Sequence, residues 1–203
     1  GGTPSLLSEE QAGKIIEATR KNSIVSDDPE ITFEVNPDDV KKGYFRSLKD
    51  LGVNRISLGV QSWDDKRLKY LGRRHNAAQS AEALRLVFDE GFKNVSADLI
   101  YGIPGMNTAE MRHDIEKTLS YPVTHISAYH LTIEKGTRLA AMKEKGRLTE
   151  IDEETSNTMF TLLGNICREK GFVQYEISNF AREGFMSRHN SAYWKQVPYL
   201  GLG

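Results

Sequence analysis

Apolar and polar residues alternate in several short segments of the chain. Residues 31–35 alternate Ile, Phe and Val with Thr and Glu, and residues 55–61 alternate in the same way. Residues 95–99 and 125–131 are further apolar segments with polar residues at intervals. A period of two is typical of β-strands with one buried face. The pattern therefore predicts four strands, and the first two have an apolar face and a polar face.

One segment with helical periodicity precedes the first predicted strand, and others follow the strands. Ser8 and Gln11 have the spacing of a capping box, in which each side chain bonds a free backbone N–H, so a helix is expected to start here. Glycines are expected to end several later helices, because glycine adopts the left-handed conformation of a helix end. These later helices are expected to run from Asn36 to Leu51, up to Leu71, and over 77–90 and 109–119.

The pattern loosens after Leu131. A short helix is expected within 134–146, a long amphipathic helix over 153–170, and a further strand over 172–177. Residues 178–203 are rich in aromatic residues and show no clear period, so they are expected to be irregular. If the strands form a barrel, this segment is expected to cover its mouth or to lead to another domain.

The order of the elements predicts the fold class. Regular alternation of strands and helices implies parallel strands with crossover helices, so the chain is expected to be α/β. Glu34, Gln61 and Asp98 lie toward the ends of three strands, where a (β/α) barrel gathers its active-site residues. An open doubly wound sheet gives a similar alternation, and periodicity alone leaves both architectures open.

Composition and charge exclude several classes of protein. The chain has 203 residues with 27 Lys and Arg against 28 Asp and Glu, so no basic excess points to nucleic acid. Its apolar runs are far shorter than the ~20 residues of a membrane helix, and its start does not resemble a signal peptide. The single cysteine, Cys167, rules out an internal disulfide and is typical of a reducing cytoplasm. It also rules out a cluster held by several cysteines of this chain.

Several polar residues are candidates for a binding site. Asp98 lies among apolar residues, where a buried carboxylate needs a partner or a ligand. Glu34 and Gln61 face away from the apolar side of their strands, although a solvated edge explains such residues equally well. Arg73 lies in an Arg-Arg-His run that is either a fork for a ligand carboxylate or a solvated connection.

Three histidines are candidate ligands. His125 and His130 belong to one strand but lie on opposite faces, so they cannot hold one metal together. A histidine in a strand is more often a core residue with satisfied hydrogen bonds. His189 lies in an irregular, aromatic segment that also contains Tyr193 and Trp194.

An ordered set of motifs resembles the oxygen-independent coproporphyrinogen oxidase family of radical-SAM proteins. The motifs are Gly-Gly-Thr-Pro-Ser at 1–5, Glu-Val-Asn-Pro-Asp at 34–38, Asn-Arg-Ile-Ser-Leu-Gly-Val-Gln-Ser at 54–62, Leu-Gly-Arg-Arg-His at 71–75, Asp-Leu-Ile-Tyr-Gly-Ile-Pro-Gly at 98–105 and His-Ile-Ser-Ala-Tyr-His-Leu at 125–131. Each motif is weak alone, but the set covers nearly the whole chain in order. His-Asn-Ser-Ala-Tyr-Trp at 189–194 resembles the haem-chaperone branch of that family.

The resemblance implies a role for each matching position. Gly1, Gly2 and Thr3 match the loop that cradles the methionine end of S-adenosylmethionine. Glu34 matches the residue on its amino group and Arg73 a residue near its carboxylate. Two further positions, Gln61 and Asp98, match polar residues that contact the cofactor, with its ribose hydroxyls as the expected partners.

One feature of the family has no counterpart in the sequence. Family members hold a [4Fe–4S] cluster with a Cys-x3-Cys-x2-Cys loop that precedes the position of Gly1. The chain alone is therefore expected to carry no cluster ligand and no catalytic residue, and to be inactive. Both ends are expected to be cuts through a longer protein. Residues 1–135 are then an incomplete (β/α) radical-SAM barrel, and 136–203 complete it and begin a junction to a missing C-terminal domain.

Three functions follow from these observations. In the first, a haem chaperone binds S-adenosylmethionine, the cluster and haem, with His189 or Tyr193 on the iron, and passes haem to a receiving protein. In the second, an enzyme decarboxylates two propionates of coproporphyrinogen III. The third, a metal-dependent barrel hydrolase using Glu34 and Asp98, lacks a His-x-His pair on any predicted strand. Whether the protein is an enzyme stays open. A cytoplasmic location is expected, with neither nucleic acid nor a membrane as partner.

Overall fold

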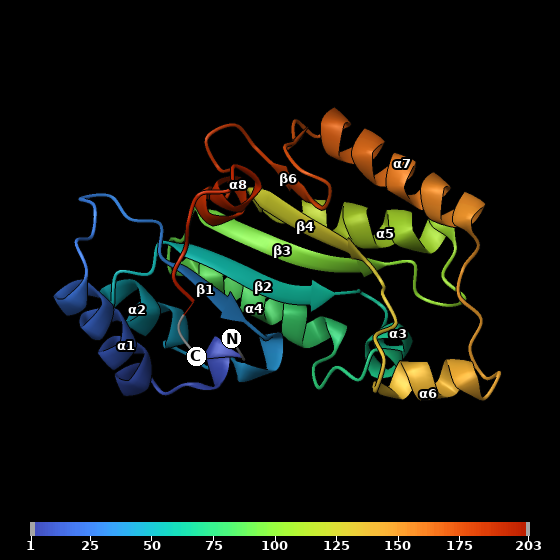
Figure 1. The fold of residues 1–203 in the computed structure, drawn as a ribbon, viewed down its shortest axis with the longest axis horizontal. Coiled ribbons are helices and arrows are strands. Elements are labelled where there is room, and N and C mark those ends of the chain that lie inside the picture. Colours follow the sequence, from blue (N-terminus) through green and yellow to red (C-terminus); the bar gives the residue numbers. More distant parts are fainter. Residues whose placement is uncertain (1–2, 202–203) are drawn as a thin grey trace.

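The computed structural model describes residues 3–201, in which a twisted six-stranded sheet carries helices on one face (Figure 1). The strands are β1 (Thr32–Val35), β2 (Arg55–Gln61), β3 (Asn94–Tyr101), β4 (His125–His130), β5 (Val173–Gln174) and β6 (Asn179–Ala181). Their order across the sheet is β1-β2-β3-β4-β6-β5. The sheet is open, because β1 and β5 form its two edges within the described residues.

Strands β1 to β4 are parallel, as the sequence predicted. The last two strands differ from the prediction, because β6 pairs antiparallel with both β4 and β5. The strand expected over 172–177 is reduced to the two residues of β5, and β6 lies in a segment that was expected to be irregular. Two and three residues are too short to show a period, so the sequence could not reveal this hairpin.

Helices connect the strands and mostly cover one face of the sheet. They are α1 (Glu9–Asn22), α2 (Tyr44–Asp50), α3 (Asp65–Tyr70), α4 (Ala77–Asp89), α5 (Thr108–Leu119), α6 (Arg138–Glu144), α7 (Glu153–Glu169) and α8 (Arg188–Trp194), with short 3-10 turns at Pro4–Leu6 and Pro37–Asp39. The capping box of Ser8 and Gln11 is confirmed at the start of α1. No helix within residues 3–201 has the length and apolar composition needed to cross a membrane.

Two helical predictions need correction. The helix expected from Asn36 is a 3-10 turn followed by a separate helix, α2. Gly43, which precedes α2, has a φ of 85°, and this left-handed conformation cannot continue a helix. The segment expected to be irregular contains α8, whose first turn is capped by the Ser187 hydroxyl. This helix is short and shows several polar and aromatic side chains to solvent, so its sequence has no clear apolar stripe.

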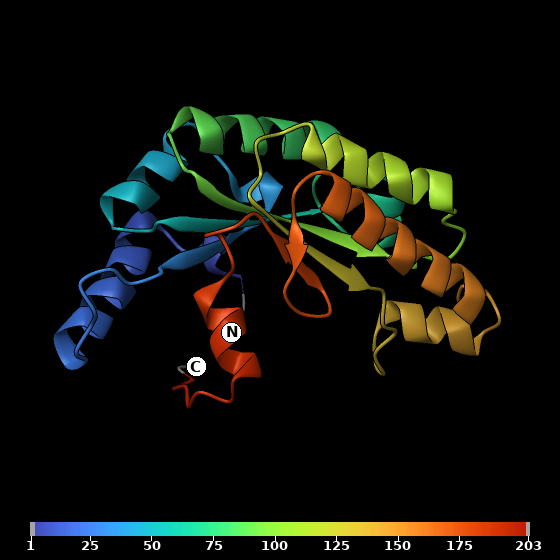
Figure 2. The same ribbon diagram turned by 90° about the horizontal axis from the view of Figure 1, so that it is seen from above.

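The two faces of the sheet have opposite character. Ile56, Leu58 and Val60 of β2 are fully buried, and they belong to the same core as Leu84 of α4 and Ile115 of α5. Figure 2 shows α4 and α5, coloured green and yellow-green, on this outer face and α8, coloured red, on the other side of the sheet. The inner face, on the side of α8, therefore carries the polar positions of the strands.

Candidate functional site

The residues that the sequence selected from the ends of the strands meet in one cavity. Thr3, Glu34, Gln61, Arg73 and Asp98 all line a space of about 230 Å³ on the inner face of β1, β2 and β3. The predicted Gly1 and Gly2 lie outside the described residues. The cofactor residues predicted within the described part of the chain thus share one site, and we call it the first cavity.

Strand register brings the polar side chains together. Glu34 of β1 pairs with Ser57 of β2, and Ser57 pairs with Ser96 of β3. Paired residues of neighbouring parallel strands point to the same face, so these side chains form a polar row across the inner face. Asp98 lies two residues beyond Ser96 on that same face.

Asp98 is held by hydroxyl groups. The Ser57 hydroxyl lies 2.9 and 3.0 Å from its two carboxylate oxygens, and the Ser96 hydroxyl donates at 3.1 Å. Burial raises the pKa of Asp98, while hydrogen bonds from these serines and Ser127, and the charge of Arg55, act in the opposite direction. The carboxylate lines the cavity and retains lone pairs for a ligand hydroxyl or ammonium.

Gln61 and Arg73 form a second polar pair at the first cavity. Arg73 Nη2 donates to Gln61 Oε1 at 3.0 Å, and Gln61 has a φ of 66° at the end of β2. Burial lowers the pKa of Arg73, and the charges of Asp98 and Asp38 oppose that change. A Cβ at Gly59 would lie 2.9 Å from the Gln61 amide nitrogen, so glycine leaves room for this amide.

Asp114 supports the loop after Gln61, and sequence reasoning missed it. This buried side chain of α5 accepts from the Ser62 hydroxyl at 2.7 Å and from the Trp63 backbone N–H at 3.0 Å. Burial raises the pKa of Asp114, and these two hydrogen bonds oppose it. Asp114 does not line the first cavity, so it can act there only by holding the backbone that follows Gln61.

A larger cavity of about 490 Å³ adjoins the first one and reaches α8. The two share Pro4, Glu34, Ser57 and Asp98. The additional lining of this second cavity consists of Glu30, Thr32, Arg55, Ser127, Tyr129, Ser187, His189 and Asn190. His189 therefore lies at a cavity, as a haem ligand requires. Tyr193 is not part of the lining, and its side chain is 59% exposed.

The two histidines of β4 have different surroundings. His125 is fully buried, with Nδ1 2.8 Å from the Ser96 hydroxyl and Nε2 2.7 Å from the Tyr175 hydroxyl. Burial lowers the pKa of His125 to about 3, so the ring is neutral. It is a satisfied core residue, as expected for a histidine in a strand. His130 lies on the other face and packs edge-on against Tyr101.

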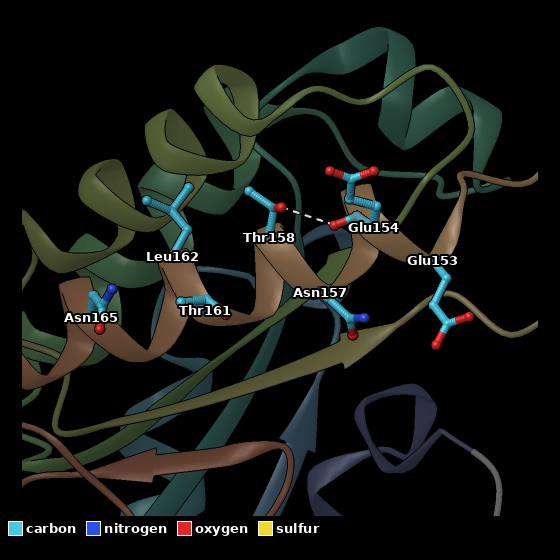
Figure 3. Close-up of a pocket in the computed structure, with 7 residues that line it drawn as sticks. All are labelled: Glu153, Glu154, Asn157, Thr158, Thr161, Leu162 and Asn165. Carbon is cyan, nitrogen blue, oxygen red and sulfur yellow. Dashed lines mark hydrogen bonds between the residues drawn. The ribbon is translucent and has the colours of Figure 1, made fainter.

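A third hollow lies away from these residues. Figure 3 shows it along α7, where the Thr158 hydroxyl donates to the Glu154 carbonyl at 2.8 Å. Its lining consists of Glu153, Glu154, Asn157, Thr158, Thr161, Leu162 and Asn165. Its lining contains none of the predicted site residues and no Arg or Lys, so the predicted site residues are grouped elsewhere.

Metal-binding side chains are not grouped in the described part of the chain. Within residues 3–201, no set of three or more His, Cys, Asp or Glu side chains is arranged to hold a metal ion. Cys167 is buried in α7, and burial raises the pKa of its thiol to about 12. A protonated thiol in the core is a poor cluster ligand, so Cys167 does not fit that role.

Comparison with known proteins relates the chain to one superfamily. Residues 1–118 match the model of the Radical SAM superfamily. Heme chaperone HemW of Bacillus subtilis (strain 168) is 37% identical over 204 residues, which cover all of this chain and 54% of that protein. Radical S-adenosyl methionine domain-containing protein 1, mitochondrial, of Mus musculus is 38% identical over 206 residues, covering all of this chain and 46% of the mouse protein. The chain thus spans about half the length of these curated relatives.

A solved structure shares the fold. Coproporphyrinogen III oxidase (HemN) from Escherichia coli, a radical SAM enzyme, superposes with a TM-score of 0.78 and 19% identity, over 96% of this chain and 44% of that one. At this identity the likeness concerns the fold alone. Together with the open sheet, in which β1 to β4 are parallel, it confirms the predicted incomplete barrel.

Proposed function

The chain belongs to the radical SAM superfamily, and from that premise we propose that the first cavity is its S-adenosylmethionine site. The observation that carries the proposal is the convergence of Glu34, Gln61, Arg73 and Asp98 on one small cavity. These four residues come from three strands and one connecting loop, so their meeting is a property of the fold.

The side chains of the first cavity fit the chemistry of this cofactor. The methionine end carries an ammonium and a carboxylate, which suit the carboxylate of Glu34 and the guanidinium of Arg73. Ribose hydroxyls suit the Asp98 carboxylate, which accepts hydrogen bonds, and the Gln61 amide, which both donates and accepts. The Glu34 carboxylate has no hydrogen-bond partner among residues 3–201, so it is available to a ligand. Thr3 borders the same cavity and is proposed to contact the methionine end, with Gly1 and Gly2 beside it in sequence.

The superfamily also implies a [4Fe–4S] cluster, and the residues of this chain do not fit it. A cysteine-bound cluster of this kind needs several thiolates, whereas the chain has only Cys167, which is buried and protonated. We therefore propose that the cluster ligands lie outside this chain.

For the whole protein we propose haem binding by a chaperone that passes haem to a receiving protein. Relatives named heme chaperone HemW, 34% to 37% identical along the whole chain, support this proposal. His189 at the second cavity is the proposed axial ligand, because imidazole is a common haem donor. The exposed Tyr193, whose ring lies 6.5 Å from that of His189, is the weaker candidate. The oxidase alternative is supported only by a likeness of fold.

A haem titration of the full-length gene product tests the chaperone proposal. The wild-type protein is expected to develop a Soret band on addition of haem, and His189→Ala is expected to weaken or shift it. His130→Ala is the matched control, since His130 is exposed on β4 and does not line the cavity. Under reducing, anaerobic conditions with S-adenosylmethionine, coproporphyrinogen III should stay unconverted. Turnover of that substrate would replace the chaperone with the oxidase, and a Soret band unaffected by His189→Ala would move the iron ligand elsewhere.

A further inference from the structure

Arg55 is a buried cation without an acidic partner. It lies at the start of β2 on the inner face, and its side chain is only 4% exposed. Its Nη1 donates one long hydrogen bond, 3.4 Å, to the Thr32 hydroxyl. Its Nε is buried and has no hydrogen-bond partner in the described part of the chain. No carboxylate of residues 3–201 forms an ion pair with this guanidinium.

Such an arrangement is costly unless another group completes it. A charge removed from water needs a partner of opposite charge or several hydrogen bonds to compensate for lost solvation. A guanidinium has five N–H donors in a planar fork, which matches the two oxygens of a carboxylate. With one long bond formed, Arg55 retains most of this capacity. The chemistry that would satisfy it is a carboxylate.

The second cavity gives a ligand access to Arg55. Arg55 is the one Arg or Lys among its lining residues, and the cavity volume of about 490 Å³ is within the ~300–1,000 Å³ typical of small-molecule sites. His189 and Asn190 of α8 line the same cavity. A ligand there can therefore face both the guanidinium and the imidazole.

Three acidic residues of the described chain line the second cavity, Glu30, Glu34 and Asp98, and none of them forms an ion pair with Arg55. Glu30 accepts hydrogen bonds from the backbone N–H groups of Arg188 at 2.9 Å and His189 at 3.3 Å, at the start of α8. Asp98 accepts from serine hydroxyls. The charge of Arg55 acts on Asp98 through space, and the Glu34 side chain is assigned to the amino group of S-adenosylmethionine. The free N–H donors of Arg55 are therefore open to the carboxylate of a ligand.

We propose that Arg55 binds a propionate carboxylate of the porphyrin in the second cavity. The inference rests on the proposed haem function, because that function supplies a ligand with carboxylates. It adds a specificity: the site distinguishes a porphyrin with free propionates from one whose propionates are esterified. A small carboxylate unrelated to the porphyrin could bind Arg55 in the same way. The dimethyl ester distinguishes the two, because only a propionate that binds Arg55 makes porphyrin affinity depend on the free carboxylates.

The experiment compares two ligands on the full-length gene product. Haem and haem dimethyl ester are titrated into the wild type and into the Arg55→Met, Arg55→Lys and Arg85→Met variants. Loss of a charge-assisted hydrogen-bonded pair is expected to weaken haem binding by roughly ten- to a hundredfold in Arg55→Met. Binding of the ester is expected to change less than about twofold, because it has no carboxylate to lose. Arg55→Lys should fall between, since lysine keeps the charge without the fork.

Controls separate a structural role from a binding role. Arg85 lies on the exposed surface of α4 and pairs with Glu82 and Asp89, so Arg85→Met should leave both affinities unchanged. Should Arg55→Met fail to fold, Arg55→Lys carries the test, with a smaller but still haem-selective loss.

Each contrary result has a separate meaning. Equal losses for haem and its ester would overturn the inference, because they indicate a structural role for Arg55. Unchanged haem affinity in Arg55→Met, or a wild type that binds the ester as tightly as haem, would also overturn it. A wild type that binds neither ligand would instead remove the proposed haem function, and the inference with it.

Discussion

The two faces of the same sheet contrast in what their residues contact. On the outer face, Ile56 and Leu58 are fully buried in the helix-covered core. On the inner face, the alternate residues Arg55 and Ser57 of the same strand line cavities. Because alternation assigns neighbouring residues to opposite faces, the outer face can supply stability while the inner face supplies binding groups. A single change on one face should therefore affect one property far more than the other.

The inner face is still tied to the fold at two points. His125 extends the polar row into the core through Ser96 and Tyr175, and Asp114 holds the loop after Gln61 from behind. These contacts predict that changes at such residues affect stability as well as the cavities. At His125 and Asp114, a substitution is therefore not expected to affect binding alone.

The largest effect is expected on the outer face. Leu58→Ala removes a fully buried side chain and leaves a cavity, which typically lowers the free energy of unfolding by about 2–5 kcal/mol. Urea denaturation followed by circular dichroism measures it. Ser57→Ala, the neighbour on the inner face, should cost clearly less. A loss below about 1 kcal/mol for Leu58→Ala would contradict the assignment of this face to stability.

The next effect concerns cofactor affinity. Arg73→Ala and Asp98→Ala each remove a charged hydrogen-bonding group from the first cavity, which should weaken S-adenosylmethionine binding by about 1.5–3 kcal/mol, roughly ten- to a hundredfold. Calorimetry on the full-length protein measures it. Arg74→Ala is the matched control, because Arg74 is exposed and pairs with Asp38 and Asp39 outside the cavity. Unchanged affinity in both variants would remove the assignment of the first cavity.

Asp114→Ala should lower both the stability of the fold and the affinity for S-adenosylmethionine. The change leaves the Ser62 hydroxyl and the Trp63 N–H without their buried acceptor, which costs about 1–3 kcal/mol of unfolding free energy. Cofactor affinity should fall as well, because the loop that carries Gln61 loses its support. Asp114→Asn keeps an acceptor and should recover part of both losses. A stability loss with unaltered affinity would make Asp114 purely structural.

His125 should make the free energy of unfolding depend on pH. Its folded pKa of about 3 lies below the ~6.5 of an unfolded histidine, so below about pH 6.5 the unfolded chain binds a proton that the folded protein does not. This group therefore lowers the free energy of unfolding as pH falls, by at most about 1.4 kcal/mol per pH unit. Asp98 and Asp114, with raised pKa values, contribute in the opposite sense.

Replacing His125 isolates its share of the pH dependence. Denaturation of the wild type and His125→Gln at pH 7 and pH 5 should show a shallower decline for the variant, because the carboxylates are common to both proteins. Parallel declines would indicate that His125 is protonated in the folded protein, contrary to its burial and its two hydrogen bonds.

The smallest effect is expected at Gly59. An added Cβ lies 2.9 Å from the Gln61 amide nitrogen, which is the end of a flexible side chain and can shift. Gly59→Ala should therefore fold with nearly wild-type stability while its cofactor affinity falls a few-fold, because Gln61 and Arg73 lose their alignment. Calorimetry and a melting curve on the same sample check both parts. A large drop in stability with normal affinity would contradict this account.

The sequence predicted what a local pattern determines. The bounds of β2 match residues 55–61, and Glu34, Gln61 and Asp98 converge as expected, because a period of two assigns each residue to a face. The incomplete barrel is confirmed for the same reason, since the strand–helix alternation extends over the first four strands.

The remaining features depend on distant neighbours. Asp114 and Trp63 are 51 residues apart in the sequence, so no local sequence pattern predicts their contact. Arg55 belongs to a strand that was predicted correctly, yet its lack of an acidic partner is visible only once the surrounding elements are placed. Helix α8 and strand β6 are too short to show a period, so their places depend on packing.

The central claim is that the inner face of the sheet is the cofactor-binding face. A crystal structure of the full-length gene product, grown anaerobically with S-adenosylmethionine, tests it most directly. We expect the cofactor in the first cavity, with its amino group at Glu34, its carboxylate at Arg73 and its ribose near Gln61 and Asp98. Cofactor density elsewhere, such as in the hollow along α7, with only water in the first cavity, would show that the inner face does not bind the cofactor.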